Sequence, residues 1–339
     1  MGDRGQWSPG TIISRTPLRV SFAGGGTDMP AFFSEHQGAV VSATINRYVY
    51  VQVKPHSELF FEPIRINYSR SEQVNTIDEI ENNIARECLR LLDIDPPIYI
   101  STVGDVPAST GLGGSSAFCV GLLNALHMLK GEQVSPGQLA EEASRVEIDV
   151  LSEPIGKQDQ YAAAFGGLNL FTFKTQGAVS VEHKWHVNSD LHRLFGSIMM
   201  FWTGHQRDAS GVLVEQQQNI DARMDVLIRM RDQAYELERL LETSDFDIEK
   251  FAAILDEGWR LKRSLASRIT TPQIDGWYEA AIRAGALGGK LCGAGGGGFL
   301  MLIVPPQARK AVQNTLANLA YMPISYESLG SQVVIPFNR

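Results

Sequence analysis

The stretch Pro107-Ala-Ser-Thr-Gly111-Leu-Gly-Gly114-Ser115-Ser116-Ala117, between a predicted strand and a predicted helix, decides how the fold is interpreted. Its glycines allow the backbone to approach a ligand closely and to form turns that a Cβ would prevent. The helix that follows directs free amides and the positive end of its dipole toward the loop. The stretch therefore predicts a polyphosphate-binding loop. The alternative is an ordinary glycine-rich turn with serine caps.

This loop differs from two common phosphate-binding motifs. No Lys-Ser or Lys-Thr follows it, as a Walker A loop requires, and Ser116 stands where a dinucleotide fingerprint has its third glycine. A formal G-x-G-x-x-G occurs at 293–298, but it leads into a predicted strand rather than a helix. We therefore reject a dinucleotide-binding function for both segments.

The elements expected around the loop differ between the two halves of the chain. The first half predicts strands at 48–53 and 98–103 and helices at 78–92, 117–129 and 135–148. The second half predicts amphipathic helices at 227–241 and 251–259 and a buried strand at 299–304. We expect two domains, residues 1–190 and 191–339.

Composition excludes several functions. The chain has 339 residues, a net charge of −8 and no basic stripe, so nucleic acid and membrane surfaces are not expected partners. Its three cysteines are far apart, which predicts reduced thiols. Residues 1–10 carry no hydrophobic signal region. We expect a cytoplasmic protein that recruits anionic ligands with a few local donors.

Two more segments carry candidate chemistry. In the stretch from Arg15 to Asp28, a strand runs into Gly24-Gly-Gly-Thr27-Asp28, where the carboxylate can accept hydrogen bonds from sugar hydroxyls. The alternative is a glycine-rich turn with an Asx cap. In the stretch 156–167, Asp159 is flanked by residues that look buried or tightly turned. This raises the odds of a site, although a lone Asp is usually a cap or a surface group.

Together, residues 16–28, 107–117 and 290–298 resemble the three motifs of the GHMP kinase superfamily, in the same order and at the same spacing. The resemblance implies a two-domain α+β fold, with a ribosomal-S5-like N-terminal domain that binds ATP and a ferredoxin-like, helix-rich C-terminal domain. It covers about residues 12–337. The stretches 15–28, 158–167, 201–209 and 259–290 are most similar to the D-glycero-D-manno-heptose 7-phosphate kinase branch.

The resemblance implies roles for individual residues. Asp159 matches the catalytic aspartate, and Arg19 would pair with it. Mg²⁺ would be held by Ser115 and Glu147, although Gly114 departs from the family pattern and leaves Ser116 as an alternative ligand. The residues expected to bind ATP are Pro107, Gly111, Leu112, Gly113, Gly114, Ser115 and Ser116.

The resemblance also implies an acceptor. The reaction would be transfer of the γ-phosphate of ATP to the anomeric (C1) hydroxyl of D-glycero-D-manno-heptose 7-phosphate, giving the 1,7-bisphosphate for nucleotide-heptose synthesis, by a monomer or homodimer. The alternatives are a free-sugar anomeric kinase acting on fucose or galactose, and a non-catalytic sugar- or nucleotide-binding relative. The candidate acceptor-binding residues are Gly25, Gly26, Thr27, Asp28, Arg207, Lys262, Lys290 and Gly296. For the three cations, the alternative is a surface charge.

Overall fold

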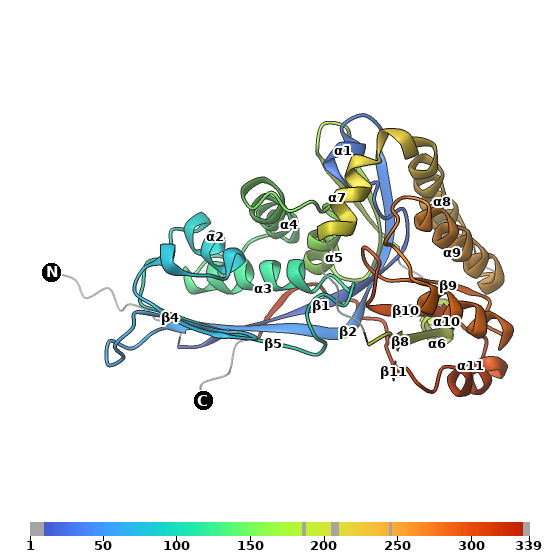
Figure 1. Cartoon of the computed structure of the whole chain (residues 1–339). Coiled ribbons are helices and arrows are strands. Elements are labelled where there is room, and N and C mark those ends of the chain that lie inside the picture. Colours follow the sequence, from blue (N-terminus) through green and yellow to red (C-terminus); the bar gives the residue numbers. More distant parts are fainter. Residues whose placement is uncertain (1–9, 185–187, 205–209, 244–245, 335–339) are drawn as a thin grey trace.

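The structure is a computed structural model that describes residues 10–184, 188–204, 210–243 and 246–334. Two sheets organise it (Figure 1). The larger has eight strands in the order β12-β1-β2-β5-β3-β4, with β6 paired to β2 and β7 to β6. These strands are β1 (Ile12–Ala23), β2 (Gly38–Pro55), β3 (Ile64–Asn67), β4 (Ser71–Val74), β5 (Ile98–Gly104), β6 (Leu168–Phe173), β7 (Val179–His183) and β12 (Gln332–Val334).

The smaller sheet is antiparallel and has the order β11-β8-β10-β9. Its strands are β8 (Ile198–Trp202), β9 (Gly288–Leu291), β10 (Phe299–Ile303) and β11 (Ala320–Met322). The α-helices are α1 (Pro30–Phe33), α2 (Asn83–Leu91), α3 (Gly114–Leu129), α4 (Pro136–Ser144), α5 (Gln158–Phe165), α6 (Asn188–Ser197), α7 (Ser210–Gln218), α8 (Met224–Glu242), α9 (Ile248–Arg263), α10 (Pro272–Arg283) and α11 (Arg309–Thr315).

Helix α3 lies on the large sheet and fixes the position of the loop before it. It packs on β1 and β2, and most of its side chains are buried. Close approach to β1 depends on Gly121, because a Cβ there would lie 2.7 Å from Thr16 Oγ1. Ser14 Oγ in turn donates to the carbonyl of Gly121 over 2.7 Å. The N-terminus of α3 is thereby held beside β1.

Strands β1 and β2 change register in the middle of their pairing. Pro17 lies opposite Tyr48, whereas Leu18 lies opposite Ile45, so β2 carries extra residues at this point. Such a bulge bends the strands and redirects side chains. Both strands bend upward beyond it, toward α8 and α9 (Figure 1). Helix α8 packs on β1 and β2, and α9 packs on β9, so this helix pair connects the two sheets.

Most predicted elements are present. The predicted strands at 48–53, 98–103 and 299–304 correspond to β2, β5 and β10, and the predicted helices at 117–129, 227–241 and 251–259 correspond to α3, α8 and α9. The predicted helix at 78–92 is a short 3₁₀ turn at 77–79 followed by α2. The predicted helix at 135–148 is α4 followed by a π-helical segment, Arg145–Val150.

The C-terminal segment departs from the expected domain division. The boundary at 190/191 falls inside α6, and β12 pairs with β1 in the large sheet. Tyr326 also bridges to Ile45 of β2. The last described residues therefore pack with the first half of the chain and not with the second. In the described part of the chain, no helix is both long enough and apolar enough to cross a membrane.

Candidate active site

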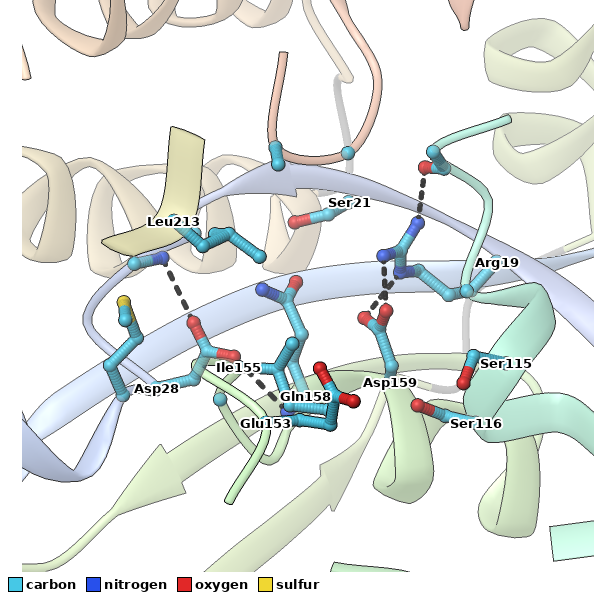
Figure 2. A pocket seen from close by; sticks show the side chains of 18 of the residues that line it. Arg19, Ser21, Asp28, Ser115, Ser116, Glu153, Ile155, Gln158, Asp159 and Leu213 are labelled. Atoms are coloured by element: carbon cyan, nitrogen blue, oxygen red, sulfur yellow. Dashed lines mark hydrogen bonds and ion pairs between the residues drawn. The ribbon is translucent and has the colours of Figure 1, made fainter. Parts of the chain in front are cut away.

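A cavity of about 380 Å³ opens where the two sheets meet. Its walls come from β1, the loop at 25–29, the start of α3, the π-helical segment, α5, and the ends of α9 and β9. Figure 2 shows Arg19 and Asp159 facing each other beside Ser115 and Ser116, with Asp28 at the other side of the view. Segments far apart in the sequence thus supply one site.

The predicted phosphate loop forms one end of the cavity. Helix α3 begins at Gly114 without a side-chain cap, so the amides of its first turn remain available to a ligand. The loop is pressed against the C-terminal glycine-rich segment, because a Cβ on Gly111 would lie 2.5 Å from the carbonyl oxygen of Cys292. Gly111 also has φ +81°. A side chain is therefore excluded at this position both by space and by backbone conformation.

Glu147 lies at the end of this loop on the π-helical segment. Its Oε1 accepts a hydrogen bond from Ser115 Oγ over 2.6 Å, and its Oε2 accepts one from Gln160 Nε2 over 2.7 Å. Burial raises the pKa of Glu147, opposed by the hydrogen bonds from Ser115, Ser116 and Gln160. A buried carboxylate surrounded by neutral donors and hydroxyls is a fitting partner for a hard cation. Ser115 and Glu147 therefore suit Mg²⁺.

Arg19 connects Asp159 to the phosphate loop. Its Nε and Nη2 donate to the two carboxylate oxygens of Asp159 over 2.7 and 2.6 Å, while Nη1 donates to the carbonyl of Gly111 over 2.7 Å. Arg19 is 6% exposed. Such a bidentate pair fixes the orientation of the carboxylate as well as its charge. Asp159 is thus held at the mouth of the loop where a phosphate would lie.

Asp28 lies deeper and holds two segments together. Its Oδ1 accepts from the amide of Gly26 over 2.9 Å, and its Oδ2 accepts from the amide of Gln158 over 3.2 Å. Burial raises the pKa of Asp28 despite these hydrogen bonds. The carboxylate also requires a glycine at 156, because a Cβ there would lie 2.1 Å from Oδ2. Asp28 therefore ties the first glycine-rich loop to the start of α5.

Two lysines line the cavity from the smaller sheet and from the helix that packs on it. Lys262 of α9 donates to the carbonyl of Gly293, and Lys290 of β9 donates to the carbonyl of Phe22 over 3.4 Å. Burial, with the nearby charge of Lys290, lowers the pKa of Lys262 to about 7. Burial likewise lowers the pKa of Lys290 to about 8, with Arg19 contributing. Among the described residues, neither lysine forms an ion pair with a carboxylate, and buried amines of this kind are well suited to a multiply charged anion.

The structure brings most predicted residues to this cavity. Those that line it are Arg19, Gly25, Gly26, Asp28, Gly111, Gly113, Gly114, Ser115, Ser116, Glu147, Asp159, Lys262 and Lys290. Arg207 lies outside the described residues. Four other predicted residues are absent from the lining of this cavity: Pro107, Leu112, Thr27 and Gly296.

Three of these four have other roles. The hydroxyl of Thr27 is buried and donates to the carbonyl of Gly24 over 2.8 Å, which stabilises the turn. The side chain of Leu112 is buried in the core, and the amide of Gly296 donates to the carbonyl of Ile269 over 2.8 Å. The motifs predicted segments that line the cavity, but not which side chains of each turn face it.

Several lining residues were not predicted, among them Ser21, Glu153 and Gln158. A signal existed for two of them. Ser21 is two residues after Arg19 on a strand, so both side chains face the same way. Gln158 directly precedes Asp159 in the first turn of α5.

Comparison with known proteins agrees with this geometry. Residues 75–167 match the GHMP kinases N-terminal domain, and residues 236–321 match the GHMP kinases C-terminal domain. A D-glycero-alpha-D-manno-heptose 7-phosphate kinase of Campylobacter jejuni is 28% identical over 87% of this chain and 90% of its own length. An L-fucokinase/L-fucose-1-P guanylyltransferase of Bacteroides fragilis is 25% identical over 94% of this chain, but only 37% of that protein is covered.

A solved structure shows the same fold. The D-glycero-D-manno-heptose 1-phosphate kinase of Bacteroides thetaiotaomicron superposes with a TM-score of 0.79 and 26% identity, covering 96% of this chain and all of the other. The phosphate loop, the Arg19–Asp159 pair and the two matched domains lead to one conclusion. The chain belongs to the GHMP kinase family.

Proposed function

We propose that this kinase transfers the γ-phosphate of ATP to the anomeric hydroxyl of D-glycero-D-manno-heptose 7-phosphate. The observation that carries this proposal is that one cavity is lined by two separate groups of donors suited to anions. The amides at the start of α3 form one group, and Lys262 and Lys290 form the other. A kinase for a free sugar needs only the first group, whereas an acceptor that already carries a phosphate needs both.

The reaction divides among four groups of the chain. The amides of the first turn of α3 hold the β- and γ-phosphates. Asp159 orients the anomeric hydroxyl and accepts its proton as the bond from that oxygen to the γ-phosphorus forms. The bond from the γ-phosphorus to the bridging oxygen breaks, and ADP leaves. Arg19 holds the Asp159 carboxylate in place, and its remaining N–H donors can balance charge on the transferred group.

Ser115 and Glu147 would hold Mg²⁺ at the phosphate loop. When bound, the ion neutralises charge on the phosphates of ATP. The hydrogen bond from Ser115 Oγ to Glu147 Oε1 holds the two oxygens next to each other at the loop. The assignment of the metal to Ser115 rather than Ser116 rests on this 2.6 Å hydrogen bond.

A second candidate function is phosphorylation of a free sugar at the same carbon, which the similarity to an L-fucokinase favours. A non-catalytic relative is disfavoured, because Arg19, Asp159 and Ser115 are present together and in contact distance of their partners. The names of the two heptose kinases also differ in the position of the phosphate. The identity of the product is therefore the informative observation.

The test is incubation of the purified protein with ATP, Mg²⁺ and a panel of heptose 7-phosphate, free heptose, galactose and fucose, with products assigned by ³¹P and ¹H NMR. We expect ADP and the 1,7-bisphosphate from heptose 7-phosphate, with a new phosphate coupled to the anomeric proton. Phosphorylation of free galactose or fucose alone would support the second candidate instead.

A further inference from the structure

We propose that Ser21 and Gln158 form a hydroxyl-binding subsite that recognises the acceptor at the position next to the reacting carbon. The proposal rests on the proposed function, because it assumes a polyhydroxylated acceptor in this cavity. Ser21 and Gln158 line the same cavity as the phosphate loop, the Arg19–Asp159 pair and the two lysines. They belong to none of these three groups. The ligand chemistry is that of a sugar hydroxyl able both to accept and to donate a hydrogen bond.

The first observation is that both side chains have an unused hydrogen-bonding atom. Ser21 Oγ and Gln158 Oε1 are buried and have no hydrogen-bond partner among the described residues. Both residues also line the cavity. Buried polar atoms are nearly always paired in folded proteins, because leaving one unpaired is costly. Two such atoms at the wall of one cavity therefore point to a ligand that would pair with them.

The second observation is that the Ser21 hydroxyl and the amide nitrogen of Gln158 border one space beside Gly25. A Cβ built on Gly25 would lie 3.7 Å from Gln158 Nε2 and 3.8 Å from Ser21 Oγ. Gly25 has no side chain, so the space between them stays open. Figure 2 shows Ser21 and Gln158 in the middle of the site, between Asp28 and Asp159.

The third observation is their position relative to the reacting groups. Ser21 is two residues beyond Arg19 on β1, and Gln158 directly precedes Asp159 on α5. Ser21 and Gln158 are therefore the neighbours, on their own elements, of the two residues proposed to act on the reacting hydroxyl. In a sugar that accepts phosphate at the anomeric carbon, the adjacent hydroxyl is the one at C2. Ser21 can donate to it, and Gln158 Oε1 can accept from it.

The chain contains a matched control for Ser21. Ser42 lies directly opposite Ser21 in the pairing of β1 with β2. Its hydroxyl is also buried and without a hydrogen-bond partner in the described structure. Ser42 is not among the residues that line the cavity. Replacing it tests the loss of a buried hydroxyl from the same place in the sheet without loss of a ligand contact.

The experiment compares heptose 7-phosphate with its 2-deoxy analogue in the wild type and in Ser21→Ala, Gln158→Met, Ser21→Thr and Ser42→Ala. We expect the wild type to prefer the full substrate by at least about tenfold in kcat/KM, because the 2-deoxy analogue leaves a buried polar group of the site without a hydrogen bond. Ser21→Ala and Gln158→Met should lose most of that preference, mainly through KM for the sugar, with KM for ATP unchanged. Ser21→Thr should retain the preference, and Ser42→Ala should match the wild type.

Two results would overturn the inference. One is equal loss on both substrates in Ser21→Ala and Gln158→Met, which would indicate a structural role. The other is a wild type that does not distinguish the 2-deoxy analogue. If the wild type ignores heptose 7-phosphate but phosphorylates another sugar of the panel, the proposed acceptor fails, and the same comparison with that sugar and its 2-deoxy analogue decides the subsite. A wild type that phosphorylates no sugar of the panel contradicts both the proposed function and the subsite.

Discussion

At the scale of single residues, Arg19 is the side chain on which the proposed catalytic geometry depends most. Through three hydrogen bonds it holds Asp159 and the carbonyl of Gly111 in one arrangement. The carboxylate cannot move away from the loop without breaking this fork. A lysine could supply the charge but not the planar, bidentate geometry.

The first prediction concerns Asp159. Asp159→Asn keeps the shape of the side chain but removes the charge that accepts or orients the acceptor proton. We expect turnover to fall by about 10² to 10⁴, the usual contribution of general acid–base catalysis. ATP affinity, measured by calorimetry with a non-hydrolysable analogue, should stay nearly unchanged. Near-normal turnover in this variant would remove Asp159 from the mechanism.

The second prediction concerns the pH dependence of acceptor binding. The pKa of Lys262 is lowered to about 7 and that of Lys290 to about 8, so both amines gain protons as the pH falls from about 9 to 6. A bound phosphate favours the charged amines. KM for heptose 7-phosphate should therefore rise as the pH increases above about 8, while KM for free heptose should change much less. Parallel pH profiles for the two acceptors would show that the lysines do not contact the phosphate.

At the scale of elements, the site is a junction of the phosphate loop, the segment 292–298 and β1. The phosphate loop approaches the segment 292–298 so closely that Gly111 and Gly293 have no room for a Cβ. A Cβ on Gly113 would in turn lie 3.3 Å from Arg19 Cγ. The C-terminal glycine-rich motif thus supports the loop from behind, which explains why a run of glycines precedes a buried strand.

The third prediction tests this contact. Gly111→Ala should destabilise the protein by more than the roughly 1 to 2 kcal/mol that a left-handed conformation costs a non-glycine residue, because the Cβ also overlaps Cys292. ATP binding should weaken with it. The matched control is Gly131→Ala, where φ is +76° but nothing lies within 4 Å. Equal changes in unfolding free energy for the two variants, measured in urea, would contradict a tight contact at Gly111.

The sequence predicted the segments that line the cavity better than it predicted the topology of the sheets. A glycine-rich loop before a helix and an isolated Asp in a tight turn have local chemical signatures, so the loop at 111–116 and Asp159 could be found from the residues and the family resemblance. Local signatures do not show which face of a turn a side chain takes, and Thr27 and Leu112 were therefore assigned to the site although they pack inward. Nor do they reveal β12, since three residues carry no periodicity and their pairing with β1 joins positions more than 300 residues apart.

At the scale of the whole molecule, the segment around Ser331 connects elements from the first half of the chain. The hydroxyl of Thr16 on β1 lies 2.8 Å from the hydroxyl of Ser331, and the amide of Ser331 donates to the carbonyl of Ala163 on α5 over 2.9 Å. The same segment carries β12. The helix that carries Asp159 and the strand that carries Arg19 are therefore both fastened by residues from the end of the chain.

The fourth prediction follows from these contacts of the segment around Ser331 with β1 and α5. A variant that ends after Met322 should have a lower melting temperature and a weaker response of that temperature to ATP, because α5 and β1 lose their contacts with the segment around Ser331. A variant that ends after Val334 retains β12 and is the control. The same melting temperature in both truncated proteins would show that the segment 323–334 does not stabilise the large sheet.

The most direct test of the account is the ratio of kcat/KM for heptose 7-phosphate to that for free heptose, in the wild type and in Lys262→Met and Lys290→Met. A hydrogen bond to a charged group contributes about 1.5 to 3 kcal/mol, and each 1.4 kcal/mol corresponds to tenfold. We predict a wild-type ratio of at least about 100 and a fall of about tenfold or more in each variant, with activity on free heptose little changed. A wild-type ratio near one would contradict the claim that the acceptor already carries a phosphate.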